Sequence, residues 1–481
     1  MVPASPAPTV EFDAELLARY DVTGPRYTSY PTAPSFREDF GEADYRAAAL
    51  ATNEDPIPRP LSLYVHVPFC ESPCFYCGCT RFITRDHCNA ARYIDHLERE
   101  IALQGALFDS DRAAVQLHLG GGTPNFLTND ELGRLVRALA SGFRLDTGAD
   151  RDFSIELDPR HVKPGDLAAL AALGFNRVSL GVQDFDPAVQ RAINRLQPAS
   201  QTEGTVAAAR EAGMRSVNLD LIYGLPRQDP ASFGATLERV VALRPERVAL
   251  YAYAHLPERF KAQRQIAARD LPAPGTKLML LGTAIRALTA AGYRYIGMDH
   301  FALPEDPLSK ALDAGTLQRN FQGYSTHGQC DLVGLGVSAI SHVDDCYAQN
   351  ARVLPDYYEA IEKGRLPVAR GLALGEDDLL RAEIIQSVMC RNALDFDAIE
   401  RRFGIDFEQR FAHELEHIAG LATDGLVTLV PRGFTVTPRG RLLLRVVAMA
   451  FDASFLRKGD KPHLPEDNGP KGPRPLYSRV I

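Results

Sequence analysis

Four of the eight cysteines of this 481-residue chain lie within ten residues, at Cys70, Cys74, Cys77 and Cys79. Thiols this close together can bind a metal or a cluster, act in catalysis, or form disulfides. The other cysteines are scattered, as small core residues usually are. Because the chain uses few cysteines for its length, we expect the four clustered thiols to stay reduced and to bind a metal or act in catalysis.

The spacing of the four thiols, C-x₃-C-x₂-C-x-C, indicates which kind of metal group they could bind. Structural zinc sites pair their ligands as C-x₂₋₄-C with a second pair well downstream, and bacterial ferredoxins use C-x₂-C-x₂-C-x₃-C. The first three cysteines, with Tyr76 before the last, match the motif of the radical S-adenosylmethionine (SAM) superfamily. This resemblance implies a [4Fe–4S] cluster on Cys70, Cys74 and Cys77 that leaves one iron open for SAM. Cys79 is either a fourth ligand or a neighbour, and the strain of an i, i+2 pair on one cubane favours the neighbour.

Two further motifs could bind a ligand beside these cysteines. The glycines of GGGTP (120–124) let backbone groups approach a ligand closely, although the motif also suits an ordinary tight turn. Glu156 and Asp158 in SIELDP share a strand face, and buried carboxylates there need a partner such as a ribose, a sulfonium or an arginine. Histidines on the strands are predicted to be structural, and none is assigned as a metal ligand.

Alternating strands and helices must position these motifs. Short β-rich runs alternate with helix-like segments such as ARYIDHLEREIALQGAL, which predicts an α/β fold with a parallel sheet wrapped by helices. Unusual polar residues, among them Gln183, Asp220 and His300, fall at the carboxyl ends of these runs, where barrels and open α/β folds build active sites. The pattern favours an enzyme. The runs are LSLYVHVPF, VQLHLGGGTP, FSIELDP, RVSLGVQDF, SVNLDLIYGLP, RVALYAYAHLP and YRYIGMDHF.

Three parts of the chain are predicted: an N-terminal arm (1–50), a catalytic domain (51–367) and a mainly helical C-terminal domain (368–481). The stretch GPRYTSYPTAPSF in the first part has no helical or strand period. The last part is predicted to combine helices, a hairpin LVTLVPRGFTVT and a final helix GRLLLRVVAMAFDASFL, which resembles a winged-helix module. A structural or lid role is favoured over nucleic-acid binding, because the net charge is −8.

The bulk composition is that of an ordinary globular protein, with 45% hydrophobic and 24% charged residues. The longest apolar stretch is broken by Arg445, so no membrane span is expected. The N-terminus lacks the basic start and apolar segment of a signal peptide, which predicts a cytoplasmic protein. A monomer is expected, since no heptad or amphipathic interface stands out.

Taken together, the motifs resemble the oxygen-independent coproporphyrinogen III oxidase (coproporphyrinogen III dehydrogenase) family. Matching segments run in order from GPRYTSYPTAP through YVHVPFCESPCFYCGC, LHLGGGTPNFL, NLDLIYGLP and RNFQGYSTH to the terminal SRVI, and so cover nearly the whole chain. The resemblance implies a partial (β/α) TIM-like barrel of the radical SAM type, with the arm over the active site. It also implies two SAM molecules in one site. Positions matching contacts to the first, cluster-bound SAM are Tyr64, Gly121, Glu156 and Ile340. Positions matching contacts to the second are Tyr76, Gly122, Thr123, Gln183, Arg195, Asp220 and Ala254.

The implied reaction is anaerobic oxidative decarboxylation of two propionates of coproporphyrinogen III to vinyl groups, giving protoporphyrinogen IX. A 5′-deoxyadenosyl radical takes a hydrogen from the β-carbon of a propionate, and the substrate radical loses CO₂ and one electron. No general base is needed, so no catalytic side chain is assigned. An external electron donor and acceptor are required. The four substrate carboxylates need cations, for which Arg26, Arg319 and the arginines of TPRGRLLLR are candidates. Each of these is also a candidate for an ordinary surface arginine.

Three alternative functions would fit some of the same motifs. A haem-binding chaperone of the same family would share the three-cysteine motif but generally lacks the fourth cysteine of CGC and the YTSYPT arm, both present here. A radical SAM methyltransferase or haem-degrading enzyme would share the cluster and the glycine segment. A zinc-binding module with a nucleic-acid-binding C-terminus would contain zinc instead of iron and sulfide.

Overall fold

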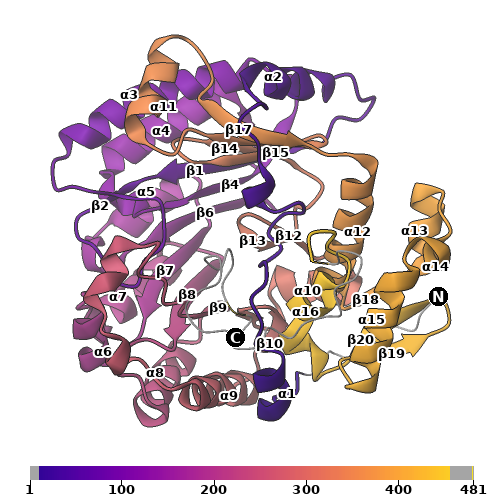
Figure 1. The fold of residues 1–481 in the computed structure, drawn as a ribbon. Helices are drawn as coiled ribbons and strands as arrows, with labels where there is room; N and C mark the ends of the chain where they lie inside the picture. Colours follow the sequence, from indigo (N-terminus) through magenta and orange to yellow (C-terminus); the bar gives the residue numbers. More distant parts are fainter. Residues whose placement is uncertain (1–9, 456–478, 480–481) are drawn as a thin grey trace.

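The structure is a computed structural model that describes residues 10–455 and residue 479. A curved sheet with helices on its outer face forms its larger part (Figure 1). From β1 to β9, neighbouring parallel strands follow one another along the chain with helices in the crossovers, as in a (β/α) barrel. The parallel strands are β1 (Leu61–Val67), β4 (Ala113–Gly121), β6 (Asp152–Leu157), β7 (Arg177–Gln183), β8 (Ser216–Tyr223), β9 (Arg247–Ala252) and β14 (Asp331–Leu335). The crossover helices are α3 (Cys88–Gly105), α4 (Asn129–Gly142), α5 (Asp166–Ala172), α6 (Pro187–Ala192), α7 (Ala199–Glu211) and α8 (Pro230–Leu243).

The parallel strands and their crossover helices confirm the predicted α/β partial barrel. Antiparallel strands extend its sheet at both edges. One edge beyond β9 carries β11 and then β10, and the other runs from β14 through β15 and β16 to β17. These strands are β10 (Arg294–Gly297), β11 (His300–Ala302), β15 (Ile340–Val343), β16 (Cys346–Asn350) and β17 (Val368–Ala373). The nearby elements are α9 (Pro274–Ala290), α10 (Pro307–Ala314), the hairpin β12 (Gln318–Asn320) and β13 (Gly323–Ser325), and α11 (Leu354–Glu362).

The predicted strands lie where the apolar runs indicated, with one exception. The run YRYIGMDHF was expected to be a single parallel strand, and this is wrong, because the chain reverses within it. Met298 has a positive φ of 49°, and the carbonyl of Asp299 accepts a hydrogen bond from Leu250 N at 2.7 Å. As a result His300 begins the antiparallel strand β11 opposite Ala249 instead of ending a parallel one.

Both faces of the parallel strands are covered, which explains their nearly continuous apolar sequences. In β1 and β8 almost every residue is buried, because helices pack on the outer face and the inner face lines the barrel. A second core joins the N-terminal arm to the C-terminal helices, since Tyr27 and Tyr30 of the arm cluster with Phe396 and Phe434.

The C-terminal region is mainly helical, with the predicted hairpin present as β19 and β20. β17 directly follows the predicted boundary at residue 367 and still pairs with β16 of the main sheet. The final helix is shorter than its sequence suggested, ending at Met449. The elements are α12 (Glu376–Arg391), β18 (Ala393–Asp395), α13 (Phe396–Phe403), α14 (Phe407–Arg410), α15 (Ala412–Thr423), β19 (Val427–Val430), β20 (Gly433–Val436) and α16 (Leu444–Met449).

The arm crosses in front of the barrel strands, between them and the C-terminal helices (Figure 1). Its GPRYTSYPTAPSF stretch is largely irregular, as predicted, but helices flank it: α1 (Ala14–Arg19) and α2 (Glu42–Ala51). Arg445 holds the arm in place by donating to the carbonyl oxygen of Pro25 at 2.8 Å and to that of Gly24. None of the helices in the described ranges has the length and apolar character needed to cross a membrane.

A buried ion pair at the start of β4 and β14 should contribute strongly to stability. Arg112 and Asp331 bond to each other with side chains that are each only 2% exposed. Asp331→Asn would leave a buried guanidinium without its counter-charge, which costs about 3–5 kcal/mol. We expect the free energy of unfolding in denaturant titrations to fall by about this amount. The control Asp150→Asn, on a fully exposed carboxylate, should change it by less than about 0.5 kcal/mol. Equal unfolding curves for the two variants would contradict the prediction.

Candidate active site

The cysteine loop begins where β1 ends, at the carboxyl end of the parallel sheet. Two short strands pair across its base, β2 (Phe69–Cys70) and β3 (Phe82–Ile83). Cys70, Cys74 and Cys77 line a pocket of about 60 Å³. The three thiols therefore face one small cavity at the barrel end where an active site was predicted.

The sulfurs in this pocket have polar partners. Thr123 Oγ1 lies 3.3 Å from Cys70 Sγ, and Arg195 Nη1 donates to Cys74 Sγ at 3.6 Å. A second guanidinium, that of Arg160, lies 3.8 Å from the same sulfur. Burial raises the pKa of the Cys70 thiol to about 11, and the hydrogen bond with Thr123 opposes that shift. Donors placed in this way can also hydrogen-bond the sulfurs of bound metal ligands.

Cys79 acts on Cys77 through hydrogen bonds. Its backbone N–H donates to Cys77 Sγ at 3.4 Å. Hydrogen bonding from Cys79 lowers the pKa of the Cys77 thiol to about 6, although burial opposes the shift. Cys79 thus supports the third cysteine of the motif, in keeping with its interpretation as a neighbour.

The arrangement of these thiols differs from that of a site for one metal ion. Around a single zinc, sulfurs at about 2.3 Å from the metal would lie roughly 4 Å from one another. Within residues 10–455, no three His, Cys, Asp or Glu side chains converge in a way that could hold one ion. Cys70, Cys74 and Cys77 instead line one small cavity.

The glycine segment at the end of β4 brings backbone against the cysteine loop. Gly121 has a φ of +116°, and a Cβ there would lie 2.6 Å from the His66 ring. A Cβ on Gly122 would lie 2.7 Å from the carbonyl oxygen of Phe69. Side chains are excluded at both positions, so the segment serves a close approach and is more than an ordinary turn.

Glu156 lies beside this segment on β6. It accepts hydrogen bonds from Gly121 N and His118 Nε2, both at 3.2 Å. Burial raises the pKa of Glu156, but the bond and charge of His118 outweigh it and hold the pKa below its ordinary value. The side chain is nevertheless 42% exposed, because it faces the barrel cavity. It is therefore an ionised group available to a ligand.

Asp158 has a different role from Glu156, because two arginines pair with it. Arg195 Nη1 lies 3.0 Å and Arg160 Nη2 lies 2.6 Å from its carboxylate. Burial raises the pKa of Asp158, but these charges lower it to about 2. The same Arg195 donates to the carbonyl of Gly181 at 2.7 Å and so links the cysteine loop to β7. The sequence left open whether Asp158 pairs with a ligand or with an arginine, and the structure shows that it pairs with arginines.

Further along the sheet, Asp220 lies within β8, and Gln183 is the last residue of β7. Asp220 accepts hydrogen bonds from Ser179 Oγ at 2.9 Å and Asn218 Nδ2 at 2.8 Å. Burial, and then the charge of Glu156, raise the pKa of Asp220 to about 6. Asp220 and Glu156 line one polar pocket of about 150 Å³ inside the barrel. Gln183 has a left-handed φ of 67°, so the chain turns sharply there.

The remaining predicted residues fall into two groups. Tyr64 lies opposite Gly334 in the sheet, and a Cβ on that glycine would lie 2.5 Å from the carbonyl oxygen of Ile340. Tyr76 and Ala254 are brought together by Gln263, whose amide donates to their carbonyl oxygens at 2.9 and 3.2 Å. Each group borders the cysteine loop or the carboxyl end of a barrel strand.

Three polar residues of this region had no role in the sequence interpretation. Arg160 pairs with Asp158, and Gln263 bridges two loops, as described above. Arg81 donates to the carbonyl oxygens of Cys77 at 3.0 Å and Cys74 at 3.4 Å, which fixes the loop conformation. In the sequence, a role for Arg81 was indicated only by its position just after the CGC motif.

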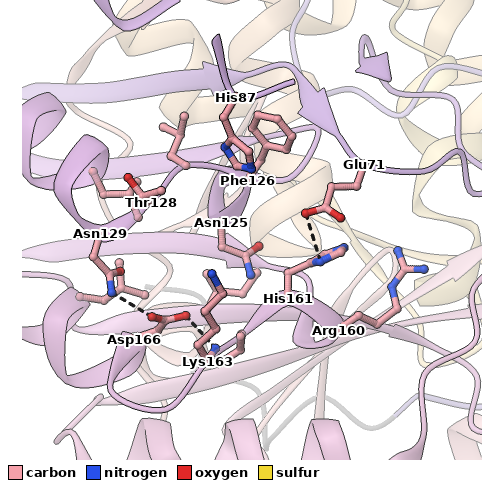
Figure 2. Close-up of a pocket in the computed structure, with 15 residues that line it drawn as sticks. Glu71, His87, Asn125, Phe126, Thr128, Asn129, Arg160, His161, Lys163 and Asp166 are labelled. Carbon is pink, nitrogen blue, oxygen red and sulfur yellow. Dashed lines mark hydrogen bonds and ion pairs between the residues drawn. The ribbon is translucent and has the colours of Figure 1, made fainter. Parts of the chain in front are cut away.

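A larger pocket, of about 380 Å³, lies on the outer side of the cysteine loop (Figure 2). It shares Glu71, Arg160 and His161 with the cluster pocket, and Glu71 and His161 lie 3.5 Å apart across it. Its other charged lining residues are Lys163 and Asp166. These three shared side chains therefore border both pockets.

Comparison with known proteins agrees with this geometry. The sequence model of the Radical SAM superfamily matches residues 64–240, and that of the HemN C-terminal domain matches residues 374–443. The oxygen-independent coproporphyrinogen III oxidase of Pseudomonas aeruginosa is 49% identical over 98% of this chain and 99% of its own. The enzyme of that name from Escherichia coli K12 is 47% identical over 93% and 96%. A solved structure of E. coli coproporphyrinogen III oxidase (HemN), described as a radical SAM enzyme, matches with a TM-score of 0.88 and 46% identity, covering 93% of this chain and all of that one.

A partial barrel with a three-cysteine loop, a glycine segment and these matches defines a radical SAM enzyme, a class that implies a [4Fe–4S] cluster and SAM. Sequence identity at this level over nearly the full length of both chains also identifies the family within this class. The chain belongs to the oxygen-independent coproporphyrinogen III oxidase family. It is an oxidoreductase for anaerobic oxidative decarboxylation in porphyrin biosynthesis, which confirms the prediction from sequence and excludes the zinc module.

Proposed function

We propose that this chain converts two propionates of coproporphyrinogen III to vinyl groups and releases protoporphyrinogen IX. The relatives that match nearly the whole chain carry the name of this activity. The observation that carries the proposal to this chain is the gathering of the cysteine loop, the glycine segment, Glu156 and Asp220 at one end of the barrel.

Cys70, Cys74 and Cys77 would hold one [4Fe–4S] cluster as its three protein ligands. With SAM bound, such a cluster supplies the radical that removes hydrogen from the substrate. Two SAM molecules would share the site. The first would contact Tyr64, Gly121, Glu156 and Ile340. The second would contact Tyr76, Gly122, Thr123, Gln183, Arg195, Asp220 and Ala254.

The side chains themselves have binding and positioning tasks. Glu156 is kept ionised by His118 and the Gly121 N–H, which suits a cationic amino group. Asp220 offers a carboxylate to ribose hydroxyls. Radical decarboxylation needs no general base, so the main demand on the protein is to exclude water and oxygen. The crossover helices and the arm meet this demand from outside the sheet.

We further propose the three-part division at residues 50 and 367, with the arm covering bound substrate. We expect a monomer that works in the cytoplasm, where free thiols stay reduced. An external donor must deliver electrons to the cluster, and an external acceptor must remove them from the substrate. The outer pocket in Figure 2 suits the donor, because it shares lining residues with the cluster pocket.

The pKa of Asp220 leads to a pH dependence. Because its pKa is raised to about 6, this carboxyl is ionised above that pH and protonated below it. If the second SAM binds to the ionised form, its affinity should fall about tenfold between pH 7 and pH 5. Anaerobic equilibrium dialysis with labelled SAM would measure this. Asp220→Asn should bind more weakly at pH 7 and show a flat profile, and an unchanged tenfold decline in this variant would contradict the assignment.

The activity itself is tested by one anaerobic assay of cluster-reconstituted protein with dithionite, SAM and coproporphyrinogen III, read by mass spectrometry. Protoporphyrinogen IX formed together with 5′-deoxyadenosine is the expected result, and their ratio gives the SAM used per propionate. Deoxyadenosine without a vinyl product would overturn the substrate assignment and favour a chaperone or another radical SAM activity.

A further inference from the structure

Two arginines, Arg26 and Arg319, meet where the arm lies against β12. Arg319 of β12 is only 7% exposed, and its Nη1 has no hydrogen-bond partner among the described residues. Its Nε donates to the backbone carbonyl of Arg26 at 3.3 Å, so the arm and the hairpin bring two arginines together. A buried guanidinium nitrogen without a partner is costly and indicates a missing anion.

Arg26 is the second member of this arginine pair. It forms an ion pair with Asp299 and lies over the Tyr251 ring, 5.6 Å from the centroid. Its side chain is 34% exposed, so part of it faces open space. Burial, and then the charge of Arg319, lower the pKa of Arg26. Asp299 thus pairs with Arg26, whereas Arg319 has no ion pair among the described residues.

Aromatic side chains connect the arginine pair to the pocket that holds Glu156 and Asp220. Arg319 lies over the Tyr324 ring at 4.8 Å, and His300 packs edge-on between Tyr324 and Tyr251 at 5.5 and 6.2 Å. All three rings line the 150 Å³ pocket. His300 Nδ1 is buried and has no hydrogen-bond partner in the part of the chain that the structure describes. Burial, followed by the charges of Arg319 and Arg26, holds the pKa of His300 well below its ordinary value, so the ring is neutral.

The other arginines considered from the sequence are already used within the protein. Arg439 pairs with Asp13, Arg441 donates to the carbonyl oxygens of Tyr295 and Ile296, and Arg445 donates to those of the arm. These contacts give the three arginines structural roles, which favours the other two candidates as carboxylate ligands. Arg26 and Arg319 remain.

We infer that Arg26 and Arg319 bind one propionate carboxylate of the substrate, with neutral His300 as an additional hydrogen-bond partner. This inference rests on the proposed function. The pocket of about 150 Å³ is half the smallest usual volume of a small-molecule site, so it admits a side chain and not the macrocycle. A carboxylate held at the arginine pair would place its propionate, or a neighbouring one, towards Glu156 and Asp220.

The test measures binding separately from turnover. Anaerobic, cluster-reconstituted protein is titrated with coproporphyrin III, the fluorescent oxidised macrocycle with the same four carboxylates, and with its tetramethyl ester. We expect Arg319→Met and Arg26→Gln each to weaken binding of the acid roughly 30-fold, with Arg319→Lys recovering part of the loss. The ester should bind weakly and equally to all variants. Arg294→Gln, which removes an arginine on the outer side of β10 paired with Asp313, is the control and should bind as wild type.

Assays with coproporphyrinogen III complete the test. We expect Arg319→Met to raise KM far more than it lowers kcat, and to leave iron content and substrate-free cleavage of SAM unchanged. Wild-type affinity for coproporphyrin III in both arginine variants would overturn the inference while leaving the proposed function intact. A wild-type protein that binds the acid through these arginines but forms no vinyl product would overturn the function and leave the carboxylate site standing.

Discussion

Cys74→Ser is expected to abolish both cluster retention and turnover. Cys74 is 9% exposed, and its sulfur accepts hydrogen bonds from Arg195 and Arg160. A serine hydroxyl keeps the size of the side chain but stays protonated at neutral pH, so it cannot replace a thiolate ligand. After anaerobic reconstitution, iron and sulfide should fall to background and product formation should be undetectable by mass spectrometry.

The matched control is Cys88→Ser. Cys88 is exposed at the start of α3 and lies outside the cluster pocket. It should keep wild-type iron content and activity. Wild-type iron and turnover in Cys74→Ser would refute the assignment of the cluster ligands, whereas losses in both variants would point to general damage by the substitutions.

Arg195→Met should lower the rate of SAM cleavage about 100-fold while the cluster remains. Arg195 binds Asp158, Gly181 and Cys74 at once. Removing one charge-assisted contact costs roughly 3 kcal/mol, which corresponds to about two orders of magnitude. Arg195→Lys should recover only part of the rate, because one ammonium group cannot reach all three partners. The measurement is 5′-deoxyadenosine formed with dithionite, normalised to iron.

The surface variant Arg239→Met provides the comparison, because that side chain is 57% exposed and pairs with Glu203 at 3.5 Å. It should cleave SAM at the wild-type rate. If Arg195→Met matched it, the residue would not belong to the SAM site. If Arg195→Met instead lost its iron, its main task would be to hold Cys74.

Much of the fold could be predicted because local sequence determines it. Apolar runs such as SVNLDLIY, bounded by turn residues, give buried strands, and the polar residues at their ends mark the active end of a parallel sheet. The reversal at Met298 was missed because YRYIGMDHF keeps its β character through the turn. Hydrophobic pattern reports burial but not strand direction.

The candidate site was predictable only in part. The cysteines that would bind the cluster lie in a sequence motif, but the side chains that position them are brought there by tertiary contacts. The cysteine spacing indicated a cluster directly. The pairing of Asp158 with Arg195, by contrast, depends on how β6 and β7 lie in the sheet. The contact of Arg26 with Asp299 spans 273 residues. No local pattern distinguishes these arginines from Arg445, which supports the backbone of the arm.

The attachment of the arm to α16 has a consequence for how the enzyme is made. Pro25 and Arg445 are 420 residues apart, so the arm leaves the ribosome long before its anchor has been translated. A nascent or prematurely terminated chain would present the three thiols with the barrel mouth uncovered. If the arm covers the active site as proposed above, that cover would therefore be fixed in place only after α16 has been translated.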